Sequence, residues 1–267
     1  MSTSSAVSSH RPLALITGAS SGIGFELAKQ FASAGFDVVV TAEDAELATA
    51  AEQLRSSGGQ VLAVQADLRA AEGVERVWAA VQERGRPLDA VALNAGIGLG
   101  RTFVEQDLDG VLSLVDLNVR STVHLAHLVA RDMAARGRGR MLFTSSIAST
   151  MPGPNQAVYN ATKSFVQSFA EALQVELKDA GVSVTSLMPG PTRTEFFERG
   201  QLEDTAMGQG PQDDPADVAR QGFEALMAGK RRVVAASLMT RVMEASNKVL
   251  PDRVKATANR IMAKPLS

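Results

Sequence analysis

The sequence predicts an α/β fold in which a doubly wound parallel sheet of about seven strands carries helices on both faces, in a single domain. Short apolar segments alternate with longer amphipathic segments from Leu13 to about Met188. Strands of a parallel sheet are buried on both faces and joined by crossover helices, which produces this alternation. A glycine-rich turn directly follows the first predicted strand. The length of 267 residues suits one such domain.

The predicted strands are short and largely apolar, as buried parallel strands should be. In chain order they are 13–17, 37–41, 61–65, 90–93, 140–144, 183–187 and 232–235. The segments between them carry apolar residues at helical spacing and predict helices at 24–34, 45–56, 74–83, 117–136, 159–179 and 215–227. Ala34-Gly35 and Ala180-Gly181 supply stops for two of these helices, because glycine is common just after a helix end.

Three segments lie outside the alternation. Residues 1–11 are Ser-rich and lack the apolar core of a secretory signal, so we expect a flexible arm there and a single domain over 12–267. Residues 195–229 include a Gly-, Gln- and Asp-containing stretch and are interpreted as a substrate flap. Residues 236–267 predict a basic, Met-containing helical tail that covers a groove or a subunit interface.

Composition argues against several classes of protein. A net charge of -2 gives no electrostatic reason to expect a nucleic acid or an anionic membrane as partner. The chain has no cysteine and only three scattered histidines, so we expect no disulfide and no metal site. No apolar run approaches the roughly 20 residues of a membrane span. We therefore expect a cytoplasmic protein whose partners are small molecules or copies of itself.

The turn after the first strand reads Thr17-Gly18-Ala19-Ser20-Ser21-Gly22-Ile23-Gly24. Glycines allow a tight turn and let backbone amides approach a pyrophosphate, which the positive end of the following helix attracts. We expect this turn to bind a dinucleotide through Gly18, Ser20, Ser21, Gly22, Ile23 and Gly24. A plain strand-to-helix connection is the alternative, because a glycine turn alone is a weak signal.

The second strand ends in Val40-Thr41-Ala42-Glu43-Asp44, where a dinucleotide would place its adenosine ribose. An acidic group there accepts hydrogen bonds from the ribose 2'-hydroxyl and would repel a 2'-phosphate. No arginine or lysine occurs at this point of the sequence. With Ala42 and Glu43 at the ribose, NAD(H) is slightly favoured over NADP(H). The alternative is that the two acids only open the next helix at its positive end.

Tyr159 is the only tyrosine in the chain, four residues before Lys163 and thirteen after Ser146. Residues four apart share a helix face, so the phenol and the ammonium should lie on one side. A nearby lysine favours the phenolate, and we expect it to lower the pKa of Tyr159 from about 10 towards the working pH. Ser146 could hydrogen-bond the same substrate oxygen. For this spacing alone, the alternative is a half-buried tyrosine beside a solvated lysine.

Together these features resemble the classical short-chain dehydrogenase/reductase family, from about Leu13 to Thr194. Further motifs of the family follow the later strands in the right order. They are Asp67-Leu68, Asn94-Ala95-Gly96, Asp116-Leu117-Asn118-Val119, Ser145-Ser146, Tyr159-Asn160-Ala161-Thr162-Lys163, and Pro189-Gly190 with Thr192 and Thr194. The resemblance implies a Rossmann-type fold, an oxidoreductase with NAD(H) or NADP(H), and a homodimer or homotetramer.

The resemblance also implies a role for each motif residue. Tyr159 would be the general acid or base, Lys163 would lower its pKa and bind the nicotinamide ribose, and Ser146 would orient the substrate oxygen. Asn118 would hold a water that links Lys163 to solvent. The implied cofactor contacts are Asp67 and Leu68 at the adenine, Asn94, Ala95 and Gly96 after the fourth strand, and Pro189, Gly190, Thr192 and Thr194 at the nicotinamide. Glu43 departs from the NADP-using relatives, many of which carry arginine there.

Apolar residues near these motifs favour an aliphatic or alicyclic carbonyl as substrate. They include Ile97, Leu99, Ile147, Met151, Val158, Phe196 and Phe197. No cluster of arginines would clamp a carboxylate or phosphate, although Arg101, Arg193 and Arg199 could each reach the rim. The leading hypothesis is an NAD(P)-dependent oxidoreductase that acts on a secondary alcohol or its ketone. The alternatives are a hydroxyacyl or oxoacyl thioester, a ring alcohol such as a steroid, and a dinucleotide-binding regulatory protein with little turnover.

Overall fold

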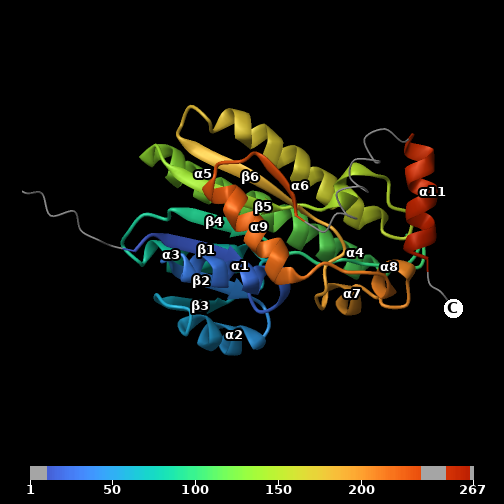
Figure 1. Cartoon of the computed structure of the whole chain (residues 1–267), viewed down its shortest axis with the longest axis horizontal. Helices are drawn as coiled ribbons and strands as arrows, with labels where there is room; N and C mark the ends of the chain where they lie inside the picture. Colours follow the sequence, from blue (N-terminus) through green and yellow to red (C-terminus); the bar gives the residue numbers. More distant parts are fainter. Residues whose placement is uncertain (1–10, 236–250, 265–267) are drawn as a thin grey trace, which may run out of the picture.

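The computed structural model describes residues 11–235 and 251–264 and shows one sheet between two layers of helices (Figure 1). The predicted N-terminal arm, apart from Arg11, lies outside the described residues. So do residues 236–250 and 265–267 of the predicted tail. Within the described ranges, no helix is long and apolar enough to cross a membrane.

All seven strands are parallel, in the order β3-β2-β1-β4-β5-β6-β7. Their bounds are β1 Leu13–Thr17, β2 Asp37–Ala42, β3 Val61–Gln65, β4 Ala90–Leu93, β5 Gly139–Thr144, β6 Val182–Pro189 and β7 Arg232–Ala235. Every predicted strand forms. β6 extends past its predicted end because Met188 and Pro189 pair with the last residues of β7.

Helices cover both faces of the sheet and bury two separate apolar clusters (Figure 1). On one face lie α1 (Gly22–Ser33), α2 (Glu46–Arg55) and α9 (Pro215–Met227), which contribute Phe31, Leu54 and Leu226 to the core. On the other lie α3 (Ala71–Gln82), α5 (Thr122–Arg136) and α6 (Ala157–Glu176), which contribute Val77, Met133 and Ala170. The predicted doubly wound α/β class in a single domain is therefore confirmed.

Two predicted elements differ from the structure. The helix predicted at 117–136 is the end of a longer run: α4 (Leu108–Val115), a π-helical turn η1 (Asp116–Ser121), and α5. The segment predicted as a flap, 195–229, also consists of two parts with different positions. α7 (Phe196–Arg199) and α8 (Ala206–Gln209) lie near the carboxyl ends of the strands, whereas α9 packs on the sheet with Val218 and Leu226 fully buried. Apolar spacing in α9 places it in the helix layer.

The strand order fixes where a ligand can bind. β1 and β4 are neighbours in the sheet, but the chain crosses from β1 to β2 on one side and from β4 to β5 on the other. Where the connections after two neighbouring strands run in opposite directions, a crevice forms outside the carboxyl ends of those strands. The glycine turn after β1 and the Asn94-Ala95-Gly96 turn after β4 both lie at that crevice.

Asp37 lies at the amino end of β2, away from the crevice, and links β2 to the segments that precede β1, β3 and β4. Its carboxylate, which is 5% exposed, accepts a hydrogen bond from Gln60 N at 2.7 Å and pairs with Arg86 and Arg11. Burial disfavours the charged form of Asp37, but the hydrogen bonds and the two positive charges outweigh burial and lower its pKa. A carboxylate whose pKa is lower in the folded state stabilises the fold above its ordinary pKa. That stabilisation is lost as pH falls through the folded value.

We therefore expect Asp37→Asn to lower the free energy of unfolding by about 2 kcal/mol at neutral pH, and the difference from the native protein to shrink towards about pH 3. Urea unfolding at both pH values measures it. The matched control is Glu52→Gln, which removes an exposed pair with Arg55 and should change little. A deficit for Asp37→Asn that is the same at both pH values would contradict the assigned pKa shift.

Candidate active site

A cavity of about 450 Å³ opens at the crevice outside the carboxyl ends of β1, β4 and β5. Every site residue that the sequence predicts lines this cavity, with the exception of Asn118. The glycine turn and the Ser146, Tyr159 and Lys163 side chains thus share one hollow, although more than a hundred residues separate them in the sequence.

The glycine turn wraps tightly around the start of α1. Gly18 has a φ of 65°, in the left-handed region that favours glycine. A β-carbon on Gly24 would lie only 1.9 Å from the Gly18 carbonyl oxygen, so the helix could not approach the strand with any other residue there. Ser21 precedes the first turn of α1, whose free N–H groups and positive dipole end face the cavity. This is a cradle for an anionic group.

Glu43 and Asp67 lie on either side of Arg69, a residue that the sequence motifs do not single out. Arg69 donates from Nε to Asp67 Oδ1 at 2.8 Å and contacts Glu43 through Nη2. Burial disfavours the Asp67 carboxylate, but the hydrogen bonds and charge of Arg69 outweigh it and hold the pKa of Asp67 below its usual value. The sequence at the end of β2 has no basic residue, but the loop after β3 brings Arg69 there.

A second arginine, Arg199 at the end of α7, also reaches the end of β2. It pairs with Asp44 at 3.5 Å and with Glu195 at 2.6 Å. Ser21 in the glycine turn donates to Glu195 at 3.2 Å. The segment after β6 is thereby attached to the other side of the cavity. Of the three rim arginines considered from sequence, only Arg199 lines the cavity; Arg101 and Arg193 pair with Asp204 and Asp214.

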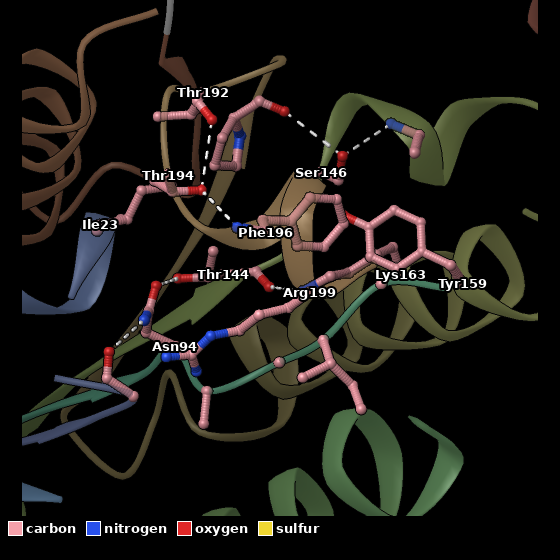
Figure 2. A pocket seen from close by; sticks show the side chains of 18 of the residues that line it. Ile23, Asn94, Thr144, Ser146, Tyr159, Lys163, Thr192, Thr194, Phe196 and Arg199 are labelled. Atoms are coloured by element: carbon pink, nitrogen blue, oxygen red, sulfur yellow. Dashed lines mark hydrogen bonds between the residues drawn. The ribbon is translucent and has the colours of Figure 1, made fainter. Parts of the chain in front are cut away.

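Tyr159 and Lys163 lie one turn apart on α6, with Ser146 opposite them at the end of β5 (Figure 2). All three side chains are largely buried, at 9%, 6% and 9% exposure respectively. Ser146 accepts a hydrogen bond from Ala148 N at 3.1 Å, which fixes its hydroxyl at the start of a short 3-10 turn, η2 (Ile147–Thr150). The neighbouring Ser145 instead donates to the Lys163 carbonyl at 3.0 Å and is occupied in the fold.

The pKa of Tyr159 shifts in the direction opposite to the one expected from sequence. Burial raises it to about 12, and a hydrogen bond with Ser146 opposes that rise only in part. Burial also lowers the pKa of Lys163 to about 8, because the ammonium loses its hydration. Lys163 Nζ donates to the Thr144 carbonyl at 2.9 Å and lies 5.9 Å from the phenol ring centroid. At neutral pH the phenol is therefore a protonated donor.

Asn118 lies in the π-helical turn η1 and does not line the cavity. Its side chain exchanges two hydrogen bonds with the Ile97 backbone, each 2.9 Å long, and donates a third to Thr162 at 3.1 Å. A β-carbon on Gly96 would lie 3.1 Å from Asn118 Oδ1 and 3.3 Å from Lys163 Nζ, so the two polar groups meet beside Gly96. Asn118 holds the loop after β4 in place, and its role at a water stays a prediction.

The other end of the cavity is mostly apolar. The Phe196 ring centroid lies 5.2 Å from that of Tyr159 (Figure 2). A β-carbon on Gly98 would lie 2.3 Å from that ring, so Gly98 leaves the space that Phe196 fills. Met207 of α8 and Met262 of α11 (Asp252–Met262) complete this end. Sequence motifs did not identify Met207 or Met262, because no fixed spacing relates these two residues to Ser146, Tyr159 and Lys163.

Comparison with known proteins gives consistent results. The family described as short chain dehydrogenase matches residues 12–204. An uncharacterized short-chain type dehydrogenase/reductase of Sinorhizobium fredii is 31% identical over 251 residues, which are 94% of this chain and 90% of that protein. Human 17-beta-hydroxysteroid dehydrogenase type 1 is 37% identical over 196 residues, 71% of this chain and 59% of that protein.

The same similarity appears among solved structures. A short-chain dehydrogenase from Sphingobium yanoikuyae in complex with NADPH superposes with a TM-score of 0.78 at 30% identity, and the match covers 89% of this chain and 92% of that one. The family match at residues 12–204 contains strands β1 to β6, the glycine turn and the Ser146, Tyr159 and Lys163 positions.

The raised pKa of the buried phenol can be measured directly. At about pH 10.5 an ordinary tyrosine is about three quarters ionised, whereas a pKa of about 12 leaves Tyr159 almost fully protonated. Ultraviolet difference absorbance at that pH should show little phenolate in the folded protein and much in guanidinium-unfolded protein. Because Tyr159 is the only tyrosine, Tyr159→Phe supplies the baseline. Equal phenolate signals in both states, with circular dichroism showing an intact fold, would refute the shift.

Proposed function

We propose that this chain, which belongs to the short-chain dehydrogenase/reductase family, transfers a hydride between a nicotinamide cofactor and a secondary alcohol or its ketone. The observation that carries the proposal is that one cavity contains both the glycine cradle and the buried Ser146, Tyr159 and Lys163 group. A protein that only bound a dinucleotide would have no use for a buried proton donor beside a hydroxyl and an ammonium.

The cavity fits such a cofactor. Gly18 and Gly24 let the glycine turn pack tightly against its neighbours, and the amides at the start of α1 would hold a pyrophosphate. Asp67 and Leu68 would hold the adenine, and Thr192 and Thr194 the carboxamide, since all four line the same cavity. When bound, the cofactor supplies or accepts the hydride.

The side chains of this chain supply the proton and the orientation. In the reducing direction Tyr159 donates its phenolic proton to the carbonyl oxygen as the hydride reaches the carbonyl carbon, and the reverse transfer accompanies alcohol oxidation. Ser146 orients the substrate oxygen by a hydrogen bond. Lys163, with a pKa of about 8, is still mostly charged at neutral pH and stabilises the phenolate that proton donation leaves. Phe196 beside Tyr159 keeps water out of the reacting pair.

The choice of cofactor rests on the end of β2. Glu43 lines the cavity there and would accept hydrogen bonds from ribose hydroxyls, which supports NAD(H) slightly over NADP(H). Arg69, paired with both Glu43 and Asp67, is a cation that a 2'-phosphate could recruit. Glu43 therefore disfavours NADP(H) in two ways: its carboxylate repels a 2'-phosphate, and its ion pair with Arg69 keeps that arginine from binding the phosphate.

The substrate end supports an apolar alicyclic or aliphatic compound. Ile97, Ile147, Met151, Phe196 and Phe197 line the cavity as predicted, although Leu99 and Val158 do not. The similarity to a hydroxysteroid dehydrogenase supports ring alcohols within this class. Assembly into a homodimer or homotetramer belongs to the same proposal, and exposed apolar side chains on α4 and α6 support it, namely Leu108, Leu112, Phe165 and Val175.

Replacing Tyr159 by Phe should abolish turnover and leave cofactor binding intact, because Phe keeps the ring and removes the proton. We expect kcat to fall by at least about 100-fold, with the Kd for NADH or NADPH, followed by cofactor fluorescence, changed little. The assay is a panel of aliphatic, alicyclic, steroid and acyl-thioester ketones run with each cofactor. Near-normal kcat in the variant would disprove the mechanism. Binding without turnover by the native chain would favour a regulatory role.

Replacing Glu43 by Arg should shift cofactor preference towards NADP(H), since a fixed guanidinium replaces an acid and Arg69 is released. We expect the ratio of kcat/KM for NADPH to that for NADH to rise by at least about tenfold. Glu46→Arg is the matched control, because it makes the same charge change three residues along the chain at a position outside the cavity lining. An unchanged ratio in Glu43→Arg would show that another group selects the cofactor.

A further inference from the structure

Two buried side-chain amides in the cavity wall have atoms without a hydrogen-bond partner among the described residues. Gln156 is 2% exposed and its Nε2 is unpaired; Asn259 is 4% exposed and its Oδ1 is unpaired. Both residues line the cavity that contains Tyr159. A buried polar atom without a partner destabilises a fold, so two of them in the lining of one cavity need a reason.

The fold makes little use of either amide. Gln156 stands at the position that precedes α6, where a side chain commonly caps the helix, yet it makes no such bond. The Asn259 side chain makes one hydrogen bond within the described residues, from Nδ2 to the Met151 sulfur at 3.4 Å. A thioether is a weak acceptor on a flexible side chain, so a stronger acceptor would displace it readily.

The two amides belong to segments that pack against each other. Asn155, next to Gln156, donates from Nδ2 to the carbonyl of Arg260, next to Asn259, at 3.5 Å. This contact attaches α11 to the turn before α6. Gln156 also lies directly before α6, three residues ahead of Tyr159, and both residues line the cavity. The amides therefore flank the substrate end of the cavity, within reach of a compound bound at Tyr159.

We propose that Gln156 and Asn259 form a second oxygen-binding site, which takes a hydroxyl group of the substrate several carbon atoms away from the reacting carbonyl. A hydroxyl can donate to Asn259 Oδ1 and accept from Gln156 Nε2 at once, which an ether or a simple hydrocarbon cannot do. The substrates are thus hydroxylated alicyclic ketones, or the corresponding diols, in an apolar cavity. This inference rests on the proposed function for the place of the carbonyl at Tyr159.

The test compares matched ligands. The probes are cyclohexanone against the same ring with a hydroxyl on the carbon opposite the carbonyl, and a bicyclic decalone against its analogue hydroxylated on the second ring. Calorimetric binding to full-length Tyr159→Phe protein with NADH or NADPH present measures affinity without turnover. We expect the hydroxylated member of at least one pair to bind at least about fivefold more tightly. Equal affinity in both pairs, or no binding of any probe, overturns the proposal.

Variants then assign the preference to the two amides. Asn259→Leu and Gln156→Met, each made in the Tyr159→Phe chain, should each abolish the preference, measured as the ratio of the affinities for the two members of a pair. Together the two changes should do no more than either alone, because both amides hold one hydroxyl. Thr257→Val is the matched control on α11, since Thr257 does not line the cavity, and it should keep the preference. A preference that survives Asn259→Leu places the hydroxyl elsewhere and overturns the assignment.

Turnover by the native chain separates this inference from the proposed function. Turnover of both members with equal KM, together with equal binding, would leave the oxidoreductase standing and remove the second site. Preferential binding of the hydroxylated ketone without turnover would do the reverse. With both correct, the hydroxylated substrate should show a lower KM than its partner, and Asn259→Leu should remove that difference in KM.

Discussion

One chain of hydrogen bonds holds the glycine cradle and the proton-transfer group at a fixed separation. The Asn94 amide donates to the carbonyls of Thr17 and Gly18, at 3.2 and 3.4 Å, and accepts from Thr144 Oγ1 at 3.0 Å (Figure 2). The Thr144 carbonyl in turn accepts from Lys163 Nζ at 2.9 Å. The links run from β1 through β4 and β5 to α6. A residue at position 94 therefore needs both a donor and an acceptor, and an amide side chain supplies them.

Burial sets the chemical state of the group at the end of this chain. The same loss of hydration that raises the pKa of Tyr159 to about 12 lowers that of Lys163 to about 8. The two ordinary values, about 10 and about 10.4, therefore move apart, and the phenol keeps its proton while the ammonium can lose one. A dry site thus favours proton donation from Tyr159. To abstract a proton from an alcohol, Tyr159 must be a phenolate, which requires a stronger positive charge near its ring. Lys163 Nζ lies 5.9 Å from the ring centroid and donates to the Thr144 carbonyl.

Sequence patterns predicted the parts of this protein that depend on local spacing. All seven strands, the glycine turn and the Ser146, Tyr159 and Lys163 group follow from apolar periodicity and motif order. Patterns failed where distant loops meet. Arg69 reaches Glu43 only because β3 lies beside β2, and Arg199 reaches Asp44 only because the segment after β6 folds back over the glycine turn. The opposite pKa shift of Tyr159 has the same origin, because burial depends on packing that a motif does not record.

The residues that local sequence patterns predict carry out the proposed chemistry, whereas several residues that the patterns missed shape the substrate end of the cavity. The cradle and the proton-transfer group stand on strand ends and long helices, whose positions the buried sheet fixes. The substrate end is formed by short or separate elements, α7, α8 and α11, and Figure 1 shows α11 at the edge of the molecule beside α8. Replacing Asn259 or Met207 would therefore reshape the substrate end without moving the hydrogen bonds at Asn94. A chain built this way can change its substrate by mutation in these elements and keep one chemistry.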